Sequence, residues 1–69
     1  MSGVAITLNG AERRLDEGTT LAGLLESLGL PAGRVAVERN GRIVPRERYG
    51  EILLAEGDRL EVVTLVGGG

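Results

Sequence analysis

Residues 59–66, RLEVVTLV, are the most strand-like stretch of this 69-residue chain, and three glycines follow them directly. Successive side chains of a strand point to opposite faces of a sheet. One face therefore carries Leu60, Val62, Thr64 and Val66, and the other carries Glu61, Val63 and Leu65. Because both faces are largely apolar, we expect this strand to lie in the interior of a sheet.

The N-terminal segment predicts a hairpin. Val4, Ile6 and Leu8 alternate with small or polar residues, which is typical of a half-buried strand. Asn9-Gly10 follows, and this pair tolerates the positive φ angles of a tight hairpin turn. Residues 11–15 then return as the second strand.

A helix is predicted next. Four leucines at positions i, i+3, i+4 and i+7 form one apolar stripe, which we assign to the core: Leu21, Leu24, Leu25 and Leu28. Thr19 or Thr20 can cap the helix by accepting a backbone hydrogen bond. Gly29 suits the left-handed residue that ends a helix, and Pro31 prevents the helix from continuing.

The second half of the chain predicts a third strand around Val35 and Val37, a turn at Asn40-Gly41, a short extended piece at 43–44 and a single turn at 46–50. This order indicates an α+β fold: a β-grasp (ubiquitin-like) mixed sheet with one main helix packed on one face. We place the last strand between the first and the third. Residues 1–66 then form a single domain, and 67–69 form a flexible tail.

The composition argues against an independent enzyme. The chain has no His, Cys or Lys, so it lacks the usual bases near neutrality and the thiolate and amine nucleophiles. The carboxylate pairs Asp16–Glu17 and Glu56–Asp58 lie beside glycines, and we interpret them as solvated turn residues. No acidic loop of the calcium-binding type occurs. We expect no metal site and no bound cofactor.

The charge is uneven along the chain. Residues 34–48 hold five arginines and two glutamates, a net +3, while three arginines and eight acids elsewhere give −5, for a total of −2. An acidic chain whose basic segment lacks interleaved aromatic residues is not expected to bind nucleic acid. For these arginines, steering of a partner and simple solubility both stay open.

The sequence also predicts the cellular compartment of the protein. It contains no apolar run long enough for a membrane helix. The first ten residues lack the basic and apolar regions of a secretory signal. We therefore expect a cytoplasmic protein, monomeric when free.

Two stretches carry a family resemblance: VERNGRIVPRERY (37–49) and AEGDRLEVVTLVGGG (55–69). In order, they contain an Asn turn, an apolar pair before a charged run with one aromatic residue, a Gly-Asp turn, a β-rich strand and terminal glycines. This set resembles the ThiS family, the small ubiquitin-like sulfur carriers of thiamine biosynthesis. The N-terminal half fits in length but is generic.

The resemblance implies a protein carrier and co-substrate. The carboxylate of Gly69 would be adenylated by a ThiF-type enzyme with ATP and Mg²⁺, and a persulfide sulfur donor would then displace AMP to leave a thiocarboxylate. Thiazole synthase (ThiG-type) would take the sulfur to build the thiazole ring. Gly67, Gly68 and Gly69 would enter the partner's active site.

The residue chemistry agrees with this interpretation. A chain without Cys cannot carry sulfur as a persulfide on its own side chains, and glycines let the backbone enter a narrow site. Val63 and Leu65 face away from Leu60 and Val62, so we interpret them as partner-docking residues, the alternative being that a loop or the 43–54 segment covers them. Tyr49, the one aromatic residue, is assigned to packing at the domain edge.

Three other classes stay open. The small subunit of molybdopterin synthase shares the fold and the thiocarboxylate chemistry, but it commonly has a proline shortly before its terminal glycines, where this chain has TLV. A ubiquitin-like protein modifier would end in an isopeptide bond on a target lysine. A binding-only β-grasp domain would undergo no chemistry at its tail.

Overall fold

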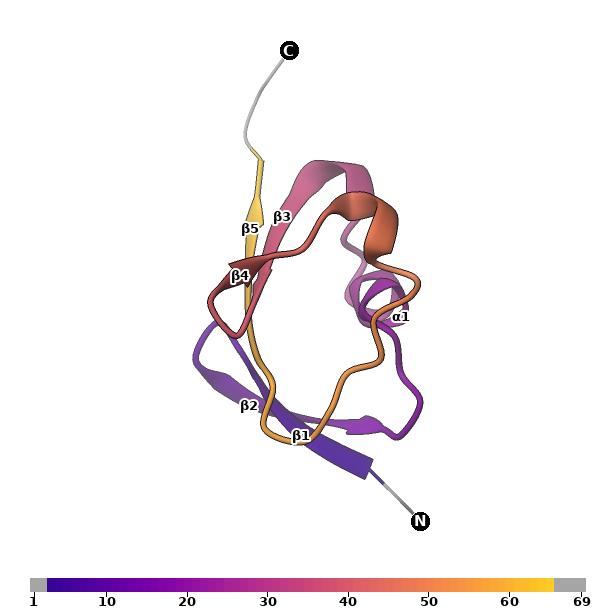
Figure 1. The fold of residues 1–69 in the computed structure, drawn as a ribbon, viewed down its shortest axis with the longest axis vertical. Helices are drawn as coiled ribbons and strands as arrows, with labels where there is room; N and C mark the ends of the chain where they lie inside the picture. The colour runs from indigo at the N-terminus through magenta and orange to yellow at the C-terminus, as the bar shows by residue number, and fades with distance from the viewer. Residues whose placement is uncertain (1–2, 66–69) are drawn as a thin grey trace.

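The computed structural model describes residues 3–65 and shows one mixed sheet with a helix, α1, packed on one face (Figure 1). In chain order the elements are β1 (Gly3–Leu8), β2 (Ala11–Asp16), α1 (Leu21–Ser27), η1 (Ala32–Arg34), β3 (Val35–Arg39), β4 (Arg42–Ile43), η2 (Arg46–Arg48) and β5 (Arg59–Thr64). The strand order is β2-β1-β5-β3-β4. β5 runs parallel to β1 and antiparallel to β3. The predicted β-grasp arrangement is confirmed, with the last strand between the first and the third.

Both predicted Asn-Gly turns are confirmed. Asn9 and Gly10 have φ angles of 51° and 86°, and Asn40 and Gly41 have 52° and 84°. Positive φ at both central residues defines the hairpin turn that matches the twist of the flanking strands. The first turn joins β1 to β2, and the second joins β3 to β4.

The two asparagine side chains have a second role, which the sequence analysis did not predict. The Asn9 amide nitrogen donates to the Val62 carbonyl at 3.1 Å, and its oxygen accepts from the Val62 N–H at 2.8 Å. The parallel pairing of β1 with β5 ends at Leu8 and Leu60, so this amide stands in for the next residue of a strand. On the other side of β5, the Asn40 amide oxygen accepts from the Arg59 N–H at 2.8 Å.

Helix α1 begins and ends as its sequence indicates. Thr20 is the N-cap, and its hydroxyl oxygen accepts from the Gly23 N–H at 3.0 Å. Gly29 has a φ of 73°. Its N–H donates to the Glu26 carbonyl, and the Leu30 N–H donates to the Leu25 carbonyl, which is the Schellman pattern.

The core lies between α1 and the sheet. Of the predicted leucine stripe, Leu21, Leu24 and Leu25 are buried and Leu28 is partly buried against them. From β5, Leu60 and Val62 reach this core, whereas Thr64 is exposed. The remaining core side chains come from the first strand, the third strand and the segment before β5: Ile6, Leu8, Val35, Val37, Val44, Tyr49 and Leu54.

Tyr49 corrects one expectation. Its side chain is only 3% exposed, so it belongs to the core and not to the domain edge. Its hydroxyl donates to the Val35 carbonyl at 3.4 Å. The packing role is confirmed, because a ring buried in this way offers no surface for recognition.

Asp58 corrects another expectation, because it is buried and not a solvated turn residue. One carboxylate oxygen accepts from the Arg39 Nε at 3.0 Å and from the Ala55 N–H at 2.8 Å, and the other accepts from the Asn40 amide at 3.0 Å. The carboxylate thus joins the turn before β5 to the end of β3. Its neighbour Glu56 is exposed but also bonded, since its carboxylate accepts from the Ala5 N–H at 2.8 Å.

Candidate functional site

The predicted site begins where β5 ends. β5 extends to Thr64, and the Leu65 N–H still donates to the Arg34 carbonyl at 2.7 Å. The backbone is therefore hydrogen-bonded beside the start of β3 as far as Leu65. Gly67, Gly68 and Gly69 lie outside the described residues, so their roles stay predictions, as does the division of the chain at residue 66.

The predicted docking residues face the side of the sheet opposite α1. Val63 is 60% exposed and Leu65 is 56% exposed, so both side chains stay largely accessible, although Leu65 borders a hollow that residues 43–47 help to line. Val63 lies directly opposite Ala36. Ile43, on β4, shares this face and is 68% exposed. We call these four residues the open-face patch: Ala36, Ile43, Val63 and Leu65.

This face of β5 was expected to be largely apolar, but two of its side chains, Arg59 and Glu61, are charged. On this face of the strand Glu61 lies between Arg59 and Val63, and all three side chains are exposed. β5 is confirmed as an interior strand of the sheet, but among its side chains only Leu60 and Val62 are buried. The apolar side chains of the other face are left accessible because one helix covers only one side of the sheet (Figure 1).

Some arginines of the basic segment 34–48 form ion pairs, and others do not. Arg39 pairs with Asp58 at 3.0 Å, and Arg48 pairs with Glu51 at 3.1 Å. Among residues 3–65, Arg34, Arg42 and Arg46 take part in no ion pair. The Arg34 carbonyl accepts from the Leu65 N–H, so the Arg34 backbone lies beside the end of β5.

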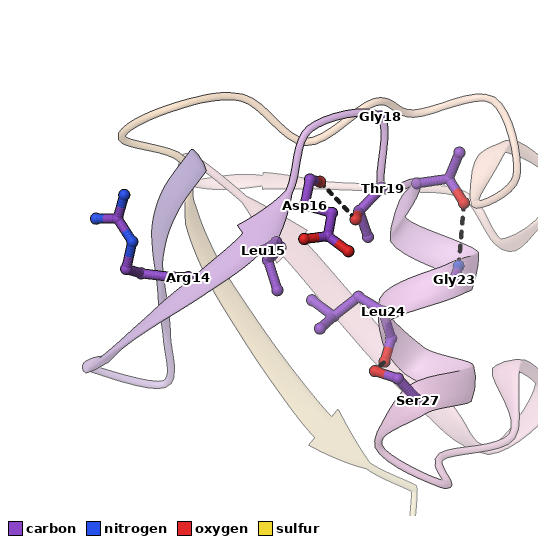
Figure 2. Close-up of a pocket in the computed structure, with 9 residues that line it drawn as sticks. Arg14, Leu15, Asp16, Gly18, Thr19, Gly23, Leu24 and Ser27 are labelled. Carbon is purple, nitrogen blue, oxygen red and sulfur yellow. Dashed lines mark hydrogen bonds between the residues drawn. The ribbon is translucent and has the colours of Figure 1, made fainter. Parts of the chain in front are cut away.

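A shallow hollow lies between β2 and α1, and the hydrogen bonds among its lining residues are local ones (Figure 2). The Thr19 hydroxyl donates to the Asp16 carbonyl at 2.6 Å, and the Ser27 hydroxyl donates to the Leu24 carbonyl at 2.7 Å. Figure 2 shows the Arg14 side chain extending away from these groups. The Thr19 bond holds the β2–α1 connection in place, and the Ser27 bond lies within α1. The hollow is lined by none of the predicted site residues.

Residues 3–65 contain no group of three or more acidic side chains placed to hold a metal ion. Within the same residues, no helix has the length and apolarity of a membrane span.

Comparison with known proteins gives consistent matches. The sequence model of the ThiS family matches residues 6–69. The sulfur carrier protein ThiS of Bacillus subtilis is 42% identical over 65 residues, covering 93% of this chain and 98% of that protein. The crystal structure of a thiamine biosynthesis protein (ThiS) from Geobacter metallireducens superposes with a TM-score of 0.80 at 32% identity, covering 96% of this chain and all of that one.

A longer protein also matches. A thiazole synthase of Magnetococcus marinus is 50% identical over 64 residues, which are 93% of this chain but only 20% of that protein. This chain therefore spans one fifth of the synthase. The family match covers nearly the whole chain and extends through the three glycines, and the fold agrees with a solved ThiS structure. On this evidence, the chain belongs to the ThiS family.

Proposed function

We propose that this chain, a sulfur carrier of thiamine biosynthesis, carries its sulfur as a thiocarboxylate at Gly69. The observation that supports this most is the placement of β5. The strand is fixed on both sides, by Asn9 and by β3, and it ends beside an exposed apolar patch. Residues 66–69 can extend at most about 14 Å beyond Leu65. A partner that binds the patch is therefore within reach of the terminal carboxylate.

The chemistry requires activation because a carboxylate is a poor acyl donor. A ThiF-type enzyme with ATP and Mg²⁺ would join the Gly69 carboxylate to AMP and release pyrophosphate. The terminal sulfur of a persulfide donor would then attack the acyl carbon, and AMP would leave with the bonding electron pair. Attack by a second donor thiol on the resulting acyl disulfide would leave the thiocarboxylate on Gly69 and a disulfide on the donor.

Thiazole synthase is the proposed acceptor of this sulfur. The similar segment within the Magnetococcus marinus thiazole synthase supports this partner, because it places a ThiS-like domain and a synthase in one chain. In this scheme the carrier is a co-substrate, and its own side chains perform no catalytic step. Val63 and Leu65 would dock the carrier, while Gly67 and Gly68 would let the backbone pass into the partner's active site.

The test is intact-mass spectrometry after incubation with the adenylating enzyme of the same organism, ATP, Mg²⁺ and a persulfide donor. We expect a mass increase equal to the difference between sulfur and oxygen, mapped to the C-terminal peptide. A chain in which residues 68–69 are deleted serves as the control and should gain no mass. Modification at another position, or none with the cognate enzymes, would contradict the proposal.

A further inference from the structure

Two glutamates lie directly opposite each other on the open face of the sheet. In the antiparallel pairing of β3 with β5, Glu38 is the partner of Glu61. Directly opposed side chains point to the same face, with Cβ atoms about 5 Å apart. Glu38 is half-buried and Glu61 is exposed. Both carboxylates therefore stand on the face that α1 leaves uncovered.

This pair is not neutralised within the carrier. Among residues 3–65, neither glutamate forms an ion pair. Arg59 lies on the same face of β5, two residues before Glu61, but it too forms no ion pair in this part of the chain. Like charges directly opposite each other destabilise a sheet. The arrangement thus carries a cost in the free protein.

The glutamate pair is bordered by the open-face patch. Ile43 lies opposite Glu38 on β4, and the next opposed pair toward the end of β5 is Ala36 with Val63. Carboxylates that border exposed apolar side chains match the layout of a protein interface, where a polar rim surrounds an apolar centre. The pair also lies on the strand that leads into the tail.

We propose that Glu38 and Glu61 together bind an arginine side chain of the adenylating enzyme, and that this contact orients the carrier for entry of its tail. The proposal rests on the proposed function. A guanidinium offers a planar fork of donors to two carboxylate groups and is weakly hydrated, so it tolerates apolar neighbours. In the proposed scheme the adenylating enzyme is the first partner that must capture the free carrier from solution. Complementary charge accelerates such an encounter.

The experiment uses the full chain with Glu38→Gln and Glu61→Gln, made singly. Glu26→Gln is the matched control, because Glu26 is an exposed glutamate of α1 on the opposite side of the sheet. Three quantities are measured: the urea midpoint of the carrier alone, its Kd for the adenylating enzyme at low and high salt, and the rate of thiocarboxylate formation at saturating carrier.

For either variant at the pair, we expect an unchanged or higher urea midpoint, because the repulsion is relieved. Binding should weaken about fivefold or more at low salt, with a smaller salt dependence than that of the wild type. The saturating rate and the Glu26→Gln control should match the wild type. Stabilisation of the carrier with loss of binding is the combination that a purely structural pair would not produce.

Two outcomes would overturn the inference while leaving the proposed function intact: normal binding of the adenylating enzyme by both variants, or a clearly lower urea midpoint. Failure of the wild-type chain to be loaded at all would overturn the proposed function and the inference with it.

Discussion

At the residue scale, Asp58 shows how burial and bonding compete for one carboxyl group. Burial raises its pKa, because the charged form loses hydration. The hydrogen bonds from the Ala55 N–H, the Asn40 amide and Arg39, together with the charge of Arg39, outweigh burial and hold the pKa below its usual value of 3.8. The native state therefore keeps this side chain ionised.

Replacing Asp58 by Asn should destabilise the fold by about 2–3 kcal/mol. The substitution keeps the shape of the side chain but removes the charge that pairs with Arg39 and one of the acceptors. Urea unfolding measures the change. Asp16→Asn, at an exposed aspartate whose backbone carbonyl makes the local bond, is the control and should stay within about 0.5 kcal/mol of wild type. Equal effects at both sites would contradict this account.

The same carboxyl predicts a pH dependence. Its pKa is lower in the folded chain than in the unfolded chain, so the unfolded state binds the proton first on acidification. The stabilisation from Asp58 should be fully present above about pH 5 and decline as the pH falls through and below 4. Urea midpoints measured from pH 6 to pH 3 should fall less steeply for Asp58→Asn than for the wild type. Parallel slopes would show that other acids dominate.

At the scale of the elements, Asn9 connects a turn to the strand that carries the site. It adopts a positive φ and also supplies both hydrogen-bond partners of the Val62 backbone. Asn40 combines a positive φ with a bond to the Arg59 N–H. Two hairpin turns thereby hold β5 from its two sides, in addition to the strand pairing.

Asn9→Gly should separate these two roles. Glycine keeps the positive φ without strain. The free energy of unfolding should therefore fall by about 1–3 kcal/mol, which measures the contribution of the two amide hydrogen bonds. Asn9→Ala should lose about 1–2 kcal/mol more, because alanine is strained at this φ. Chemical unfolding of the series tests the order wild type, Gly, Ala. Glycine at wild-type stability would show that the side-chain bonds contribute nothing.

At the scale of the whole molecule, the core and the proposed reactive end are separate parts of the chain. The buried cluster is formed by residues from Ile6 to Val62. The residues to which we assign sulfur transfer come after it. Stability and function should therefore respond to different substitutions.

Deletion of Gly68 and Gly69 should leave the thermal unfolding midpoint nearly unchanged and abolish sulfur loading. Chain ends outside the packed core contribute little to stability, and the deletion removes the carboxylate that is to be activated. Differential scanning fluorimetry and intact mass measure the two effects on the same sample. A large fall in the midpoint would mean that the glycines have a structural role.

Leu65→Glu should weaken binding to the adenylating enzyme or to thiazole synthase by about 1–3 kcal/mol, because it replaces an apolar contact with a charge that binding would have to desolvate. The fold should survive, since Leu65 is largely exposed. Leu53→Glu is the control: Leu53 is similarly exposed, at 60%, but lies in the connection before β5 and outside the open-face patch. Normal binding by Leu65→Glu, or unfolding, would contradict the docking assignment.

Local patterns were sufficient to predict most of the fold. The leucine spacing predicted α1 and its buried face, and the Asn-Gly pairs predicted both hairpins, because such signals depend on neighbouring residues. The short η1 helix was not predicted, and β5 ends at Thr64, before Leu65, which the prediction had included in the strand. Asp58 and Tyr49 were placed too near the surface, because burial depends on segments distant in sequence.

The sequence by itself determined the strand and helix order, the absence of the usual catalytic side chains and the resemblance to the ThiS family through residue 69. The tertiary structure decided which groups meet: Asn9 with Val62, Asp58 with Arg39, and Glu38 with Glu61. The physical reason is that strand register joins residues 19 to 53 positions apart. A one-residue shift of that register would turn the side chains of the shifted strand to the other face of the sheet.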